Sequence, residues 1–289
     1  MQFSELMRSM QRAGDGWKLQ VPEDWQQGRS LFGGLQAALL ARAMRGLLPA
    51  GLPLRSLQVA FIAPVAAGEV TLHARLLRAG KNVQQLEARI VAGDETLCLG
   101  LGVYGAPRES KVGRIPVQPA PPPAGEMIAL PILPGVTDGM PRSLPAPVSL
   151  PYVPGLLPEF TQHFNARWLR GSLPLSGSDA TQQVIELDLL DDGGLDEGAG
   201  DIDETHVLAL ADFIPPIALN MLDRPVAGSS LSWMIEFLRD DYVGLGLSNW
   251  RVDAEMVAAR DGYTNQSVTL WGPHGEPIAL SRQSMVIFG

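Results

Sequence analysis

The hydrophobic positions of the first hundred residues predict one helix followed by four strands. After Gly33-Gly34, leucine and alanine recur at helical spacing as far as about Leu48, which indicates a helix with one apolar face. Alternating or continuous apolar runs separated by turn residues then predict strands at 54–62, 68–79, 82–92 and 96–104. Such a helix has to be covered, and a curved antiparallel sheet wrapped around it would do so.

A similar order of elements returns after residue 158. Apolar runs predict strands at 164–170 and 182–190, and four more at 231–238, 250–259, 264–271 and 278–288. Between these groups we expect a helix from about Asp212 to Leu222, with Asp212 as its N-cap and Pro215 and Pro216 in the first turn. The sequence therefore predicts an α+β fold of two repeats, each a helix wrapped by an antiparallel sheet, with the two sheets joined into one continuous sheet.

The prolines divide the chain. Of the 24 prolines, 14 lie between Pro107 and Pro158. Proline lacks a backbone donor and favours extended geometry in the residue before it, so this stretch is expected to be a strap and not a core element. The predicted domains are an N-terminal repeat at 1–106, a proline-rich linker strap at 107–158 and a C-terminal repeat at 159–289.

Composition narrows the classes of function. The 289 residues carry 22 basic and 31 acidic side chains, a net charge of -9, which argues against a nucleic-acid partner. The most apolar helical stretch, 35–48, is interrupted by Arg42 and Arg45, so no membrane anchor is expected. The single cysteine, Cys98, excludes an intrachain disulfide framework and favours a cytoplasmic location. Four scattered histidines lack metal-ligand spacing, so no metal is expected.

Short stretches in both halves resemble a known family. They are Leu31-Phe32-Gly33-Gly34-Leu35-Gln36, Ala209-Leu210-Ala211-Asp212-Phe213, the run from Ser229 to Phe237, and Ser281-Arg282-Gln283. In this order and spacing the chain resembles the double-hotdog acyl-CoA thioesterases, in particular those like acyl-CoA thioesterase II. The resemblance covers most of residues 20–105 and 160–289.

The resemblance implies a catalytic trio of Asp212, Ser230 and Gln283. It also implies an acyl-CoA substrate, contacts to that substrate from Phe32, Gly33, Gly34 and Trp233, no cofactor, and the option of a homodimer of double hotdogs. The chain departs from the family just after the serine, where Ser232-Trp233 replaces a frequent Asp-His and Glu236 stands in place of a frequent aromatic residue.

Hydrolysis of a fatty acyl-CoA needs an activated water and a stabilised carbonyl oxygen. Asp212 suits the first task, with Ser230 and Gln283 orienting the water, and a helix N-terminus would keep its carboxylate ionised. The N–H groups at Gly33-Gly34 suit the second task. Each residue also has a purely structural alternative: a helix cap for Asp212, a turn for Ser230, a solvent-facing position for Gln283, and close helix packing for the glycines.

Two other functions stay open. One is hydration of an enoyl thioester, a reaction that pairs an Asp with a His in this fold; His206, six residues before Asp212, is expected to precede the helix. The other is a non-catalytic module that binds acyl thioesters. Candidate contacts to coenzyme A phosphates, unranked, are Arg29, Lys81, Arg167, Arg170, Arg260 and Arg282.

Overall fold

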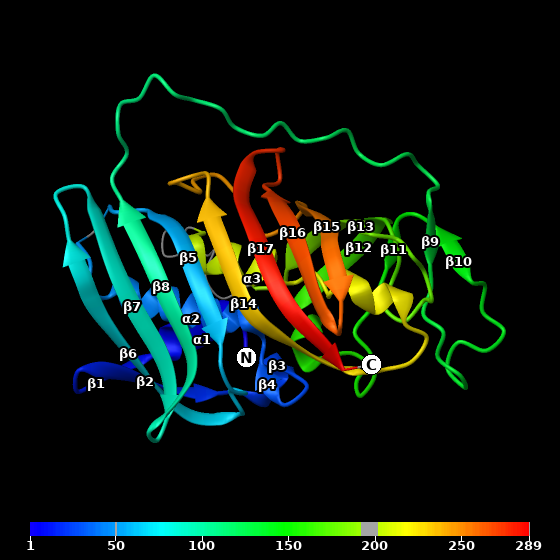
Figure 1. The fold of residues 1–289 in the computed structure, drawn as a ribbon, viewed down its shortest axis with the longest axis horizontal. Coiled ribbons are helices and arrows are strands. Elements are labelled where there is room, and N and C mark those ends of the chain that lie inside the picture. Colours follow the sequence, from blue (N-terminus) through cyan, green and yellow to red (C-terminus); the bar gives the residue numbers. More distant parts are fainter. Residues whose placement is uncertain (50, 192–201, 289) are drawn as a thin grey trace.

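A single curved sheet wraps around two central helices in the computed structural model, which describes residues 1–49, 51–191 and 202–288 (Figure 1). The central helices are α2 (Gly33–Arg45) and α3 (Glu204–Ala211). The sheet has 13 strands in the order β1-β2-β6-β7-β8-β5-β14-β17-β16-β15-β13-β12-β11, and all of its strand pairs are antiparallel. The predicted α+β double hotdog with one continuous sheet is confirmed.

The two halves of the chain meet at one strand pair. The first half contributes β1 (Gln11–Ala13), β2 (Gly16–Val21), β5 (Leu54–Phe61), β6 (Gly68–Ala79), β7 (Val83–Ala92) and β8 (Glu95–Gly105). The second contributes β11 (Val148–Ser149), β12 (Phe164–Arg170), β13 (Gln182–Leu189), β14 (Ala227–Phe237), β15 (Trp250–Arg260), β16 (Tyr263–Trp271) and β17 (Pro277–Phe288). The join is the β5–β14 pair, in which Val59 lies opposite Trp233.

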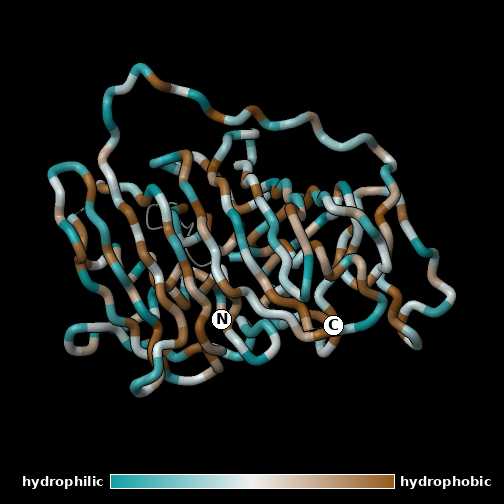
Figure 2. The backbone as a smooth tube through the Cα atoms, in the orientation of Figure 1, coloured by the Kyte–Doolittle hydropathy of each residue, from teal (hydrophilic) through white to brown (hydrophobic). Residues whose placement is uncertain are grey.

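Alternation along the strands puts one apolar face against the helices. Leu57 and Val59 of β5 and Trp233 and Ile235 of β14 are buried on that face. Figure 2 shows hydrophobic and hydrophilic positions interleaved along the strands. Helix α1 (Phe3–Ser9) adds its own buried face to the same core. Among the described residues no helix is both long and apolar enough to cross a membrane.

The central helices run antiparallel to each other. At one end, Gly34 of α2 lies so close to α3 that a Cβ built on it would be 2.9 Å from the carbonyl oxygen of Leu208. At the other end, Arg45 Nε donates to Glu204 Oε1 at 2.8 Å. The start of α2 therefore faces the end of α3.

The predicted position of the second helix was wrong. The helix begins at Glu204 because Asp203 caps it, accepting from the Thr205 N–H at 2.8 Å, and it ends with Asp212 as its C-cap. Pro215 and Pro216 do not continue it, and a short 3-10 turn, η3 (Ile217–Met221), follows. His206 consequently lies inside the helix and not before it.

The proline-rich strap crosses one end of the sheet. Residues 106–126 form neither helix nor strand and run from β8 to the small β9–β10 pair (Met127–Ala129, Ser143–Pro145) (Figure 1). Arg251 Nη1 donates to the carbonyl oxygen of Pro119 at 3.0 Å and pins the strap. β11 then pairs with β12 at the sheet edge. The division at 107 and 158 stays a prediction, and the strap residues Val148–Ser149 form the edge strand of the 13-stranded sheet.

We expect Gly34→Ala to destabilise the fold. The added Cβ would lie 2.8 Å from the Phe32 ring and 2.9 Å from the Leu208 carbonyl oxygen, so the helices would have to separate. Overpacking of this kind lowers the free energy of unfolding by about 1–3 kcal/mol, which urea denaturation measures. Gly113→Ala is the control, because in the described part of the chain nothing beyond its two sequence neighbours lies within 4 Å of the place its Cβ would take. Equal stability of both variants would contradict the close helix contact.

Candidate active site

Asp212 ends α3 and points at the beginning of α2. Its side chain is buried, its Oδ1 accepts from Gln283 Nε2 at 3.0 Å, and its carboxylate accepts from the backbone N–H of Gly34. A Cβ on Gly33 would lie 2.6 Å from Asp212 Oδ2. Because the two glycines have no side chains, the carboxylate can approach the α2 backbone. They therefore permit close helix packing and a polar contact at the same place.

Ser230 and Gln283 come from adjacent strands. Gln283 of β17 is buried on the inner face of the sheet, and its Nε2 donates to Ser230 Oγ at 2.9 Å. One amide nitrogen thus joins Asp212 to Ser230. The structure brings the three residues of the predicted trio together, while their catalytic role stays a prediction.

A bulge in β14 turns Ser230 inward. The β14–β17 register shifts between Ser230 and Ser232, and Ser230 lies opposite the buried Met285. Without the extra residue, strict alternation from Trp233 would place Leu231 on the inner face, but Leu231 is exposed. The bulge is therefore what places the hydroxyl within reach of Gln283.

The electrostatics of Asp212 differ from the sequence-based expectation. Burial raises its pKa to about 7, and the hydrogen bonds from Gln283 and the Gly34 N–H oppose this increase only in part. The carboxylate lies at the C-terminus of its own helix, so that helix dipole does not favour the charged form. The N-terminus that stabilises the ionised Asp212 carboxylate is that of the other helix, α2, through the Gly34 N–H.

Aromatic side chains pack beside this group. Phe32, the N-cap of α2, stacks on Phe160 with ring centroids 4.1 Å apart, and Phe164 packs on Phe213, the residue after Asp212. Trp233 lies directly opposite Gln283 on the inner face and is 1% exposed. Phe32 and Trp233 are thus core residues next to the trio, and their contact with substrate stays a prediction.

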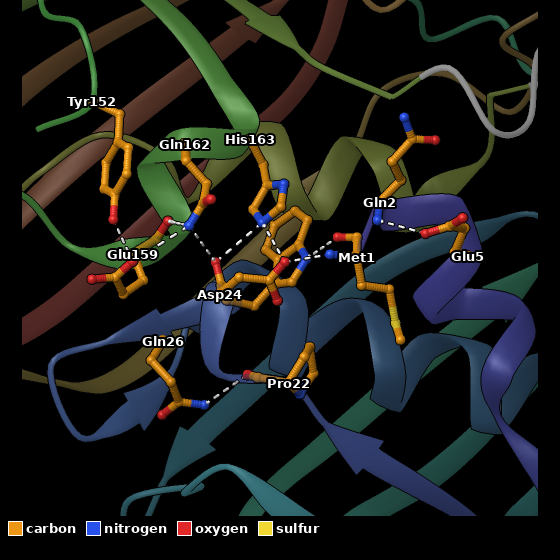
Figure 3. Close-up of polar contacts among 11 residues, drawn as sticks. Met1, Gln2, Glu5, Pro22, Asp24, Gln26, Tyr152, Glu159, Gln162 and His163 are labelled. Atoms are coloured by element: carbon orange, nitrogen blue, oxygen red, sulfur yellow. Dashed lines mark hydrogen bonds and ion pairs between the residues drawn. The ribbon is translucent and has the colours of Figure 1, made fainter. Parts of the chain in front are cut away.

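Sequence reasoning missed the short turn η2 (Glu159–His163), which carries Phe160. Figure 3 shows Gln162 and His163 of this turn directed at Asp24. His163 Nε2 is 3.1 Å from the Asp24 carbonyl oxygen, and the His163 ring stacks on Trp25 at 4.0 Å. These partners are distant in the sequence, so no local pattern could have indicated them.

The remaining candidates lie elsewhere. His206 contacts Asp203 through Nδ1 at 3.0 Å and packs on Phe3, so an Asp–His pair with Asp212 is not formed. Within the described ranges no cluster of His, Cys, Asp and Glu is placed to hold a metal ion. Of the phosphate candidates, Arg167 is paired with Glu186 and Asp188, and Arg170 with Glu126. Arg282 neighbours Gln283 in β17 and therefore faces the opposite side of the sheet.

Solved structures share this architecture over nearly the whole chain. A protein of unknown function with a hot dog fold from Alicyclobacillus acidocaldarius has a TM-score of 0.78 at 20% identity, covering 99% of this chain and 98% of that one. The tesB protein of Mycobacterium avium subs paratuberculosis gives 0.71 at 14%, covering 99% and 100%. Acyl-CoA thioesterase II TesB2 of Mycobacterium marinum gives 0.69 at 13%, covering 99% and 98%. At these identities the likeness shows the fold.

Family models match both halves. The acyl-CoA thioesterase N-terminal domain matches residues 21–105, and the acyl-CoA thioesterase C-terminal domain matches residues 138–287. No curated protein sequence matches the chain. The two domain matches occur in order and together span most of the polypeptide, and they agree with the double hotdog seen here. The chain therefore belongs to the acyl-CoA thioesterase family.

Proposed function

We propose that the protein hydrolyses fatty acyl-CoA to the free acid and coenzyme A. The observation that carries this proposal is the single amide of Gln283, which donates to Asp212 at 3.0 Å and to Ser230 at 2.9 Å beside the first turn of α2. A carboxylate, a hydroxyl and helix N–H groups thus share one small region, as activation of water near a carbonyl group requires.

In this proposal Asp212 is the general base. Its ionised carboxylate removes a proton from a water molecule, whose oxygen attacks the thioester carbonyl carbon. The carbon–sulfur bond then breaks and coenzyme A leaves as a thiolate, which takes up a proton. Because water is the nucleophile, Ser230 acts by holding this water and forms no covalent intermediate.

The carbonyl oxygen that becomes negative needs donors. The Gly34 N–H is already engaged by Asp212. The other N–H groups of the first turn of α2 have no partner within the helix and point the same way. The space beside Gly33 is taken by the Asp212 carboxylate and the Phe61 ring, so a carbonyl oxygen that reaches these N–H groups would lie next to that carboxylate. The site would therefore use the backbone of the first half and the side chains of the second.

Release of free thiol from acyl-CoA esters of increasing chain length tests the proposal. Turnover of at least one straight-chain ester is expected. Binding of acyl-CoA without thiol release from any ester would favour the non-catalytic binding module instead.

Asp212→Asn should abolish most of the hydrolysis. The amide keeps the size of the side chain but cannot take a proton from water, so kcat should fall by about 10²–10⁴-fold while acyl-CoA still binds. The matched control is Asp223→Asn, at an exposed position after η3, which should keep full activity. Unchanged thiol release by Asp212→Asn would remove this residue from the mechanism.

Ser230→Ala tests the inward-facing hydroxyl. Losing one hydrogen bond to the water should lower kcat by about 10- to 100-fold and change KM little, because the hydroxyl would act on the water and not on the acyl chain. Ser232→Ala, two residues further and exposed on the other face, serves as the control in the same steady-state assay. Equal kinetics for the two variants would show that the bulge has no catalytic purpose.

Activity should increase with pH through the pKa of Asp212. Burial raises this pKa to about 7, so the base is largely protonated at pH 6 and largely ionised at pH 8. A plot of kcat/KM against pH should therefore rise with a midpoint near 7. A flat profile between pH 5 and 8 would mean that a different group, or Asp212 with an ordinary pKa, limits the reaction.

A further inference from the structure

Gln266 is a buried amide directly beside the trio with no assigned role. It lies on β16 opposite Gln283 of β17, so both side chains project from the inner face of the sheet. Directly opposed residues in an antiparallel pair have Cβ atoms about 4.5–5.5 Å apart. Gln266 is 1% exposed. The amide of Gln266 therefore lies in the protein interior, next to Gln283.

One end of this amide is held. Gln266 Oε1 accepts from the backbone N–H of Ile217 at 3.1 Å. Ile217 begins η3, shortly after Asp212, so the bond ties the segment leaving Asp212 to the strand beside Gln283. Because the oxygen accepts from an N–H donor, the nitrogen is the end of this amide that can donate to another group.

The nitrogen of the Gln266 amide lacks a partner. Gln266 Nε2 is buried and has no hydrogen-bond partner among the described residues. A buried amide N–H group that lacks a partner destabilises the folded state. Met or Leu would fill a similar volume but would leave the buried N–H of Ile217 without its acceptor, so the oxygen of Gln266 has a structural role and its nitrogen is the group that still lacks one.

The acceptor available is Oε1 of Gln283. The nitrogen of Gln283 donates both to Asp212 and to Ser230, whereas its oxygen forms no hydrogen bond within the described part of the chain. An unused donor and an unused acceptor therefore project from two opposed residues. The terminal torsion of glutamine is broad, so a rotation about it can close the contact.

We propose that Gln266 is a positioning residue that donates from Nε2 to Oε1 of Gln283 and keeps the Gln283 amide turned toward Asp212 and Ser230. This inference rests on the proposed hydrolysis and adds to it a residue that touches neither water nor substrate. With its oxygen held, the Gln283 amide cannot flip and present that oxygen to the Asp212 carboxylate.

The position also has a natural control. Gln183 of β13 is another fully buried amide on the inner face with an unpartnered atom, Oε1. Its Nε2 donates to the Ser172 carbonyl oxygen at 2.8 Å and to Asn220 Oδ1 at 3.2 Å, so it too holds η3. It pairs with Ala254 of β15 and not with Gln283.

The test compares Gln266→Met with Gln183→Met. Both variants should lower the melting temperature. Only Gln266→Met should lower kcat, by about 10- to 100-fold with KM nearly unchanged, because the catalytic groups are less well aligned. The bond from Gln283 lowers the pKa of Asp212, so loosening it should move the midpoint of the pH profile above that of the native protein. Gln266→Asn, which keeps an amide but is one methylene shorter, should shift the midpoint in the same direction.

A lower melting temperature in Gln266→Met with native kcat and native midpoint would overturn the inference, as would equal kinetic effects in both Met variants. If the native protein releases no thiol, the proposed function fails separately. A carbon-13 NMR titration of the Asp212 carboxyl then still decides the matter: a higher pKa in Gln266→Met than in Gln183→Met supports the inference, and equal values overturn it.

Discussion

The rest of the structure depends on the contact between the Asp212 carboxylate at the end of α3 and the first turn of α2. The contact requires Gly33 and Gly34, since a Cβ on either would lie within 3 Å of Asp212 or Leu208 atoms. It also requires the helices to be antiparallel, with Arg45 and Glu204 meeting at the far end. Burying a carboxylate is unfavourable, and two hydrogen bonds offset this only in part, which leaves the pKa of Asp212 near neutrality.

The two halves contribute different groups to the region around this contact. The first half supplies the first turn of α2, which begins with two glycines. The second half supplies the carboxylate of Asp212, the hydroxyl of Ser230 and the buried glutamine amides. The β14 bulge belongs to the same specialisation, because it turns Ser230 toward the interior at the strand that joins the halves. Phe32 and Phe160 stack beside this region on the side of η2. The turn η2 is held in turn by the contact of its His163 with the carbonyl oxygen of Asp24. The candidate site therefore takes its groups from both repeats.

Much of the fold could be predicted from hydrophobic spacing. The strands at 68–79 and 164–170 have the predicted bounds, and α2 begins at Gly33 as expected. The helix predicted at 212–222 is wrong because prolines suit a first turn but also end a helix, and here Asp203 and Thr205 provide the actual cap further upstream. β1 and the strap residues that pair with β12 were missed because two or three residues show no period, whereas β2 was missed although Trp17, Leu19 and Val21 alternate with polar residues.

The identity of the three candidate site residues could be predicted, but not their environment. Family resemblance indicated Asp212, Ser230 and Gln283, and the fold brings them into contact. The pKa of Asp212 could not be predicted, because it depends on burial against a helix from the other half of the chain. Gln266 could not be found either: in sequence it is one polar residue in an alternating strand, and only its register with Gln283 and its contact with Ile217 distinguish it.

A crystal structure of the protein with a non-hydrolysable acyl-CoA thioether would show directly whether Asp212 and the first turn of α2 form the reaction centre. The distance to measure joins the Asp212 carboxylate to the carbon that replaces the thioester carbonyl carbon. We expect one water molecule to fit between them, Ser230 and Gln283 to remain hydrogen-bonded, and the carbon to lie beside the first turn of α2. An acyl chain bound away from the helix junction, or a trio whose members are separated by more than one water, would contradict it.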